Sequence, residues 1–200
     1  MIAVLDYGIG NLRSAQKALE RVGAEATLVT DAGDAARADG VVLPGVGAFG
    51  ACMAALRASG LDAVVRDAVA AGTPFLGICI GFQLLYEASE EAPGVAGLGI
   101  LDGTVTPLPP GVKRPQMQWN VLEATGRDSA LLAQLGPEPW AYFVHSFAAP
   151  ASADVVATCD YGGPVTAAVE RGRLWGTQFH PEKSGPVGLA LLAAFATSCT

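Results

Sequence analysis

The segment TPFLGICIGFQLLY, residues 73–86, determines how the rest of the chain is expected to fold. An apolar run follows Pro74, the sequence Gly-Ile-Cys-Ile-Gly at 77–81 interrupts it, and apolar residues resume up to Tyr86. This pattern predicts a strand, a tight turn and a helix. Glycines two residues before and after Cys79 let the backbone turn sharply and the helix pack closely, so the cysteine side chain should project alone.

Cys79 occupies the position at which hydrolases with such a turn carry a nucleophilic serine. The thiolate is the nucleophilic form of cysteine, and the N-terminus of a helix beginning near Gly81 favours negative charge. A lone cysteine is more often a core residue, but a core strand gains nothing from neighbours without side chains. The glycines therefore make catalysis by Cys79 as good an interpretation as core packing, and a nucleophile there would have the amide N–H of Ile80 as a donor to an oxyanion.

Length, composition and charge limit the class of protein. The chain has 200 residues, of which 51% are hydrophobic, and no shift in composition divides it, so residues 1–200 are expected to form a single domain. A formal net charge of -7 argues against binding to nucleic acid or to an anionic membrane, since both require a basic surface.

Cysteine spacing and apolar segments give two further expectations. The four cysteines show no C-x-x-C spacing and there are two histidines, which predicts no metal site. No basic leader precedes the first apolar run, and no apolar segment reaches the roughly 20 residues of a membrane span. The protein is therefore expected to be cytoplasmic.

Strands and helices alternate in the first half of the chain. Apolar runs at 2–5, 26–30 and 41–43 predict three strands. Apolar residues at helical spacing predict one helix from Leu12 to Gly23, a second directly after the segment PGVGAFG at 44–50, and a third at 61–71. Such alternation implies a mostly parallel sheet with helices on both faces. Sites in these sheets form beyond the carboxyl ends of the strands, where PGVGAFG and Cys79 both fall.

The second half of the chain is richer in strands. A stretch rich in Gly and Pro leads into strand-like runs at 117–123, 141–147, 155–160, 165–170 and 174–179. A short helix is predicted at 128–135 and a terminal helix at 186–196. The strands should be more antiparallel and continue the same sheet as a flank.

Two other segments supply groups that acyl transfer needs. An amide N–H of Val46 or Gly47 that faced Cys79 would complete an oxyanion hole with Ile80. In QFHPEKS, residues 178–184, an extended backbone would place His180 and Glu182 on one face, as a base and the acid that orients it.

Each segment alone is more often an ordinary turn or a structural histidine. Together they predict one site that contains Cys79, His180 and Glu182. His145 is the only other histidine and lacks an adjacent acid, so it is the weaker candidate for the base.

The motifs GICIGFQ, FHPE and PGVG resemble those of the class I, triad-type glutamine amidotransferases, and the resemblance covers essentially the whole chain. It implies a flavodoxin-like three-layer α/β sandwich with a mostly parallel sheet, helices on both faces and an antiparallel flank, and it implies no cofactor. It also implies hydrolysis of L-glutamine through a thioester on Cys79, with His180 transferring the proton and Glu182 fixing the imidazole. The residues expected to bind substrate are Gly45, Gln83, Ser146 and Phe147.

Within that family, LDYGIGNLRS, PGVGAFG, PQMQWN, YFVHSF and FHPEKS resemble the branch that serves imidazole glycerol phosphate synthases. The resemblance implies a heterodimer with a (β/α)₈-barrel cyclase subunit, which uses the ammonia to convert PRFAR to imidazole glycerol phosphate and AICAR in histidine biosynthesis. The chain departs from the branch at Gln116, Gln118 and Phe147, where His, Gly and Tyr are expected. The positions expected to face the barrel are Asn11, Trp119, Asn120, Tyr142 and Lys183.

Other functions use parts of the same site. A free-standing cysteine hydrolase or protease of this fold would turn over substrate without a partner, whereas a glutaminase coupled to a synthase should have almost no activity alone. The glutaminase subunits of anthranilate and pyridoxal phosphate synthesis would use the same chemistry. A non-catalytic regulatory subunit would not need the complete set of Cys79, His180 and Glu182.

Overall fold

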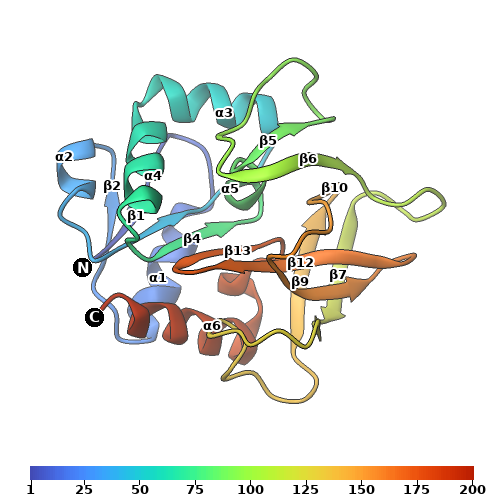
Figure 1. The fold of residues 1–200 in the computed structure, drawn as a ribbon. Helices are drawn as coiled ribbons and strands as arrows, with labels where there is room; N and C mark the ends of the chain where they lie inside the picture. Colours follow the sequence, from blue (N-terminus) through green and yellow to red (C-terminus); the bar gives the residue numbers. More distant parts are fainter.

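An eight-stranded mixed sheet forms the centre of the protein in a computed structural model that describes residues 1–200 (Figure 1). The strand order is β2-β1-β3-β4-β13-β12-β11-β8. The parallel half consists of β2 (Ala26–Val29), β1 (Ile2–Leu5), β3 (Gly40–Leu43), β4 (Phe75–Ile78) and β13 (Leu174–Thr177). This corrects the expectation that the run at 174–179 belongs to the antiparallel flank, because β13 joins the two halves by pairing in parallel with β4. The antiparallel flank consists of β12 (Pro164–Arg171), β11 (Val155–Asp160) and β8 (Glu123–Ala124).

Helices cover both faces of this sheet, as the alternating pattern predicts (Figure 1). The helices are α1 (Leu12–Arg21), α2 (Ala32–Ala35), α3 (Phe49–Ala58), α4 (Leu61–Ala70), α5 (Ile80–Gln83) and α6 (Gly185–Ser198). Helices α1 and α6 contact each other on one face, and α4 contacts α2 and α3 on the other. Strands β1, β3 and β4 are buried along their whole length, as expected for strands covered on both sides. None of these helices has the length and apolar character that crossing a lipid bilayer requires.

Two smaller sheets lie outside the central one, which corrects the expectation that all later strands continue it. One has the order β10 (Phe147–Ala148), β6 (Leu101–Pro107) and β5 (Tyr86–Ser89). The other is an antiparallel ribbon of β7 (Gln116–Val121) and β9 (Trp140–His145). Buried and more exposed side chains alternate along β9, so the ribbon covers the protein with one face and presents the other outward.

The helix after Cys79 is a single turn, which corrects the expectation of a helix through Tyr86. The carbonyl groups of Leu84, Leu85 and Tyr86 accept hydrogen bonds from main-chain N–H groups of residues 98–101. These tertiary bonds replace the continuation of the helix, and Tyr86 begins strand β5. Such competition between local and tertiary bonding is not visible in apolar spacing alone.

Residues 128–135 form turns, so the helix predicted there is also wrong. The carboxylate of Glu170 on β12 accepts hydrogen bonds from the Ser129 hydroxyl and from the N–H groups of Ala130 and Leu131. Leu131 is fully buried beneath this contact. The segment is thus held against the sheet by a distant carboxylate rather than by its own helical bonds.

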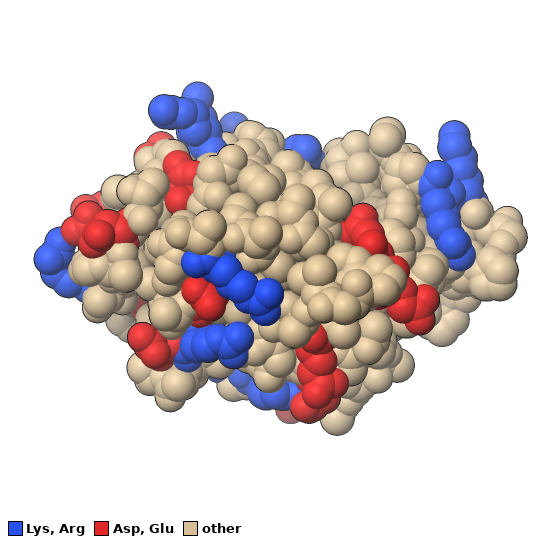
Figure 2. Space-filling view, turned by 90° about the horizontal axis from the view of Figure 1, so that it is seen from above, with Lys and Arg blue, Asp and Glu red and all other residues tan.

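Positive and negative side chains are interspersed on the face shown in Figure 2, where blue and red groups often lie side by side. Wide areas without charged side chains separate these small groups of charges from one another. This face therefore has no continuous basic surface.

Candidate catalytic site

Cys79 lies at the carboxyl end of β4, in a strained turn. Its φ of 54° and ψ of -110° are exceptional, because every other residue with a positive φ is a glycine. Such conformations cost about 1–3 kcal/mol and occur mainly at functional sites. A Cβ on Gly81 would lie 1.9 Å from the Leu43 carbonyl oxygen, so the turn can pack against β3 only with glycine there. The local geometry is that of the expected nucleophile turn.

Strand β13 places His180 beside Cys79. It pairs in parallel with β4, and the Cys79 N–H donates to the Thr177 carbonyl at 2.7 Å, so the residues after both strands emerge at one edge. His180 Nδ1 lies 2.8 Å from Glu182 Oε1, and both side chains are almost completely buried. Glu182 belongs to a 3₁₀ turn, η1 (Pro181–Lys183), so the backbone there is not extended as expected, although the two side chains meet.

His180 is held in its protonated form. Burial lowers its pKa, but the proximity of the Cys79 sulfur and of the Glu182 carboxylate outweighs burial and raises the pKa to about 10. Nδ1–H therefore donates to Glu182 at neutral pH. Nε2 is buried and has no partner within the protein. In the protonated ring, Nε2–H is available to the nearby Cys79 sulfur, which helps to raise the pKa, and to a reacting group.

Cys79 and His180 share a cavity of about 240 Å³. Gly45 does not line it but packs behind it, where a Cβ would lie 2.5 Å from the Tyr7 hydroxyl and 3.2 Å from the Ile80 Cβ. The buried Glu182 side chain contacts the imidazole of His180. The other expected catalytic, oxyanion and substrate residues all line the cavity: Val46, Gly47, Ile80, Gln83, Ser146 and Phe147.

The glycine-rich loop after β3 is held by two side chains that do not line the cavity. The Tyr7 hydroxyl donates to the Pro44 carbonyl at 2.9 Å, and the Cys52 thiol donates to the Val46 carbonyl at 3.6 Å. Gly47 has a φ of 112°, a backbone conformation that favours glycine. The loop therefore has defined anchors beside the nucleophile.

The side-chain amide of Gln83 has one atom without a hydrogen-bond partner. Its Nε2 donates to the Phe147 carbonyl at 2.9 Å and to Gln178 Oε1 at 2.8 Å. Its Oε1 is buried without a partner. An unpaired buried acceptor is costly, so this oxygen suits an N–H group of a bound ligand.

Sequence reasoning missed Glu91, which is the acidic residue in the cavity lining. Its carboxylate accepts from the N–H of Phe49 at 2.8 Å. A carboxylate in this position can attract a substrate ammonium group. Nothing in the sequence around Glu91 distinguishes it from the neighbouring Glu90, because its role depends on the loop that returns it to α3.

His145 also lines the cavity, but both of its ring nitrogens are engaged. Nδ1 lies 2.8 Å from the Phe147 carbonyl oxygen and Nε2 lies 2.9 Å from Gln116 Oε1, so a neutral ring donates its one N–H to one of these two oxygens. Burial lowers the pKa of His145 to about 4, so the ring is neutral at neutral pH. His180 is therefore the better-placed base.

Most residues expected at the partner surface gather near η1. Trp119 and Tyr142 lie opposite each other on the ribbon, with ring centroids 6.0 Å apart, and Trp119 is 48% exposed. The Tyr142 carbonyl accepts from the His180 N–H, and Lys183 is exposed in η1. Helix α1, which Asn11 precedes, also contacts η1.

Asn120 differs from this group. Because side chains alternate along a strand, it points to the other face of the ribbon from Trp119, and its amide donates to the Asp160 carbonyl at 2.9 Å. The outward face also carries Met117, which is 62% exposed and was not predicted.

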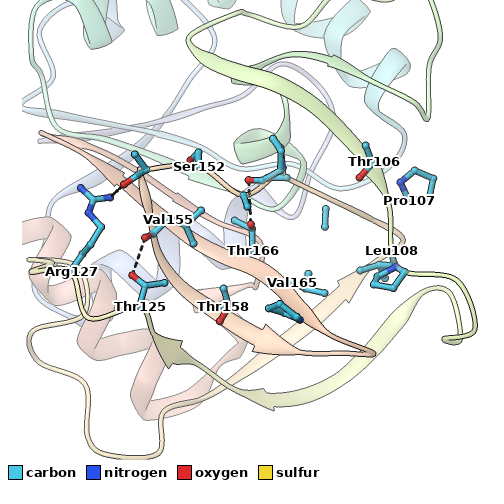
Figure 3. A pocket seen from close by; sticks show the side chains of 17 residues that line it. Thr106, Pro107, Leu108, Thr125, Arg127, Ser152, Val155, Thr158, Val165 and Thr166 are labelled. Carbon is cyan, nitrogen blue, oxygen red and sulfur yellow. Dashed lines mark hydrogen bonds between the residues drawn. The ribbon is translucent and has the colours of Figure 1, made fainter.

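A larger cavity of about 630 Å³ lies elsewhere, between β6, β10, β11 and β12 (Figure 3). The hydroxyls of Thr125 and Thr166 point to main-chain carbonyl groups, and Arg127 donates to the Ala153 carbonyl. No predicted catalytic residue lines it. Size alone therefore does not identify the reaction site.

Comparisons with known proteins identify the family of the chain. The family Glutamine amidotransferase class-I matches residues 3–199. The imidazole glycerol phosphate synthase subunit HisH of Deinococcus radiodurans is 52% identical over 198 residues, which cover 97% of this chain and 92% of that protein. The subunit of the same name from Rhodopirellula baltica is 48% identical over 202 residues, 99% of this chain and 98% of that one.

Among solved structures, a glutamine amidotransferase superposes with a TM-score of 0.76 at 23% identity, over 98% of both chains, which bears on the fold alone. The family match and the level of identity with the two relatives show which family the chain belongs to. The chain therefore belongs to the class I glutamine amidotransferase family, within the branch formed by the HisH subunits of imidazole glycerol phosphate synthase.

Proposed function

We propose that Cys79, His180 and Glu182 form the catalytic triad of a glutaminase subunit of imidazole glycerol phosphate synthase. The observation that carries this proposal is the meeting, in one cavity, of a strained Cys79 with the buried His180–Glu182 pair. The chain hydrolyses L-glutamine to glutamate and ammonia for histidine biosynthesis, in accord with relatives that are about half identical over nearly its full length.

The reaction follows from the positions of these groups. The Cys79 thiolate attacks the carboxamide carbon, and the oxyanion accepts hydrogen bonds from Ile80 N–H and from the Val46–Gly47 loop. The Nε2 proton of His180 passes to the nitrogen, and the C–N bond breaks to release ammonia and leave a thioester. His180 then removes a proton from water, whose oxygen attacks the thioester. The sulfur leaves as thiolate and glutamate is released.

The substrate's amino-acid end is assigned to the other polar groups of the cavity. The free Oε1 of Gln83 and the carboxylate of Glu91 accept N–H groups, which suits an α-ammonium. The main chain at Ser146 and Phe147, with Gly45 behind the turn, shapes the remaining wall. These roles require no metal or cofactor.

The partner is a (β/α)₈-barrel cyclase subunit in a heterodimer, where ammonia converts PRFAR to imidazole glycerol phosphate and AICAR in the cytoplasm. The curated relatives are named as subunits of this synthase. The exposed apolar face of the ribbon supports a docking surface there, since Val144 lies on this face next to Met117 and also lines the catalytic cavity. The proposed surface contains Asn11, Trp119, Tyr142 and Lys183, and it leaves out Asn120, whose side chain points to the other face of the ribbon.

Glutamate release with and without the cyclase tests this function. Turnover should be very low for the subunit alone and should rise strongly when the cyclase and PRFAR are both present. Full turnover by the isolated chain would indicate a free-standing hydrolase. Activation by an anthranilate or pyridoxal phosphate synthase partner, but not by the cyclase, would place the chain in another synthase.

Replacing Val46 with glycine is expected to raise glutamine hydrolysis in the absence of PRFAR. Val46 is not among the residues with positive φ, and β-branching disfavours that region, so we propose that the Gly45–Val46 peptide rests with its N–H turned away from Cys79. A missing oxyanion donor is worth about 3 kcal/mol, or roughly a hundredfold in rate.

Basal glutamate release by the complex measures this effect. Val46→Ala removes the branching but keeps a Cβ, so it should give an intermediate increase. If Val46→Gly binds glutamine normally and its basal rate does not change, the control of activity lies elsewhere.

A further inference from the structure

Gln178 places its side-chain amide against the catalytic sulfur. Thr177 on β13 pairs with Ile78 on β4, so Gln178 follows directly beside Cys79. Its side chain is fully buried, and Nε2 lies 3.7 Å from the Cys79 Sγ, within hydrogen-bonding range of a sulfur acceptor. The catalytic and substrate roles assigned above leave this contact unexplained.

The contacts of Gln83 decide which atom of the Gln178 amide faces the sulfur. A main-chain carbonyl can only accept, so the Gln83 atom 2.9 Å from the Phe147 oxygen must be its nitrogen. The other N–H of that nitrogen donates to Gln178 Oε1 at 2.8 Å. With its oxygen engaged there, Gln178 presents its NH₂ group to Cys79.

We propose that Gln178 donates a hydrogen bond to the Cys79 thiolate, and so stabilises and orients the nucleophile of the glutaminase reaction proposed above. A hydrogen bond to a charged acceptor is stronger than one to a neutral acceptor, so the contact favours thiolate over thiol. The donation from Gln83 polarises the Gln178 amide and strengthens its N–H groups as donors. The same bond assists departure of the sulfur when the thioester is hydrolysed.

Other titratable groups also face this sulfur. His180, supported by Glu182, lies across the cavity, Glu91 and His145 line it, and Tyr7 and Cys52 lie close to Cys79. Gln178 is uncharged, so its replacement by an uncharged residue leaves all of these charges in place. A change in the titration of Cys79 then reports the lost hydrogen bond.

Alkylation of Cys79 by iodoacetamide measures thiolate formation without glutamine or a partner. The complete chain is treated over a range of pH, and the Cys79 peptide is quantified by mass spectrometry. Gln178→Met keeps the length of the side chain but has no donor. It should move the midpoint of the alkylation rate upward by about one to two pH units and slow alkylation near pH 7 by about tenfold or more. Gln134→Met, at an exposed position in the 128–135 turns, is the matched control and should not move the midpoint.

Gln178→Glu provides a second test with nearly the same side-chain shape. Its carboxylate would lie beside the sulfur and should raise the midpoint further than methionine does. Circular dichroism establishes which variants are folded. In the synthase complex, Gln178→Met should lower kcat for glutamine hydrolysis with little change in KM, because the bond acts on the sulfur.

An unchanged alkylation midpoint in a folded Gln178 variant would overturn the proposal, even if glutamate release fell. The residue would then act on the substrate through Gln83. Failure of the wild-type complex to release glutamate would instead overturn the proposed function and leave the alkylation profile as it is. The two failures are therefore distinguishable.

Discussion

Replacing Cys79 with alanine is expected to abolish glutamine-dependent formation of imidazole glycerol phosphate and to leave ammonium-dependent formation nearly unchanged. Only the release of ammonia from glutamine needs the sulfur, since in the proposed complex the cyclase chemistry takes place in the partner. Cys79 is buried at the cavity end of β4, and the smaller alanine fits there without disturbing the ribbon of β7 and β9. Both rates are measured on the reconstituted synthase, first with glutamine and then with ammonium salt.

Cys199→Ala is the matched control for this experiment. Cys199 follows α6 and contacts the Phe195 carbonyl, outside the cavity, so both activities should persist. Cys79→Ser should behave like Cys79→Ala, because a hydroxyl is far less ionised than a thiol at neutral pH. Loss of both activities, with folding and complex formation intact, would contradict the division of roles between the subunits.

The turn around Cys79 was predictable because its chemistry is local. Gly77 and Gly81 flank the nucleophile, and a Cβ on either would meet main-chain atoms within 3 Å, so the sequence carries the constraint directly. Strands β1, β2, β3 and β4 of the parallel half were predictable for a similar reason, since they are short and apolar and helices separate them along the chain. Strand β13 was expected in the antiparallel flank, and its parallel pairing with β4 joins segments far apart in the sequence. Family membership and the mixed fold are confirmed by the comparisons.

What could not be predicted depends on contacts between distant segments. Glu170 holds residues 128–135 as turns, although the spacing there suits a helix. Glu182 reaches His180 from a 3₁₀ turn, because β13 already ends at Thr177 and the chain bends before Pro181 begins that turn. Gln178 reaches the site because β13 pairs with β4, and Glu91 reaches it because a loop returns to α3. No sequence pattern predicts either contact. The assigned roles of these residues remain predictions.

His180→Ala is expected to lower glutamine hydrolysis by about 10² to 10⁴-fold, the usual effect of losing a general acid and base. Glu182→Gln should have a smaller effect, because a glutamine oxygen can still accept from Nδ1–H and orient the ring. Glutamate release by the complex with PRFAR measures both. Ammonium-dependent synthesis is the internal control and should be retained in each variant.

The pH dependence separates orientation of His180 from its charge. The Glu182 carboxylate helps to raise the pKa of His180 to about 10, so replacing this carboxylate with an uncharged amide should lower the pKa of His180. The protonated ring is present below its pKa and is lost as pH rises through it. The alkaline decline in activity should therefore begin at lower pH in Glu182→Gln than in the wild-type complex.

The opposite assignment of the base has a clear signature. If His180→Ala kept near-normal turnover and His145→Ala did not, the base would be His145. That result would require the ring of His145 to exchange its bonds to Phe147 and Gln116 for contact with substrate. It would also require a neutral imidazole whose pKa burial lowers to about 4 to take up the proton that His180 already holds. Both requirements favour His180, because its Nε2 has no hydrogen bond to give up.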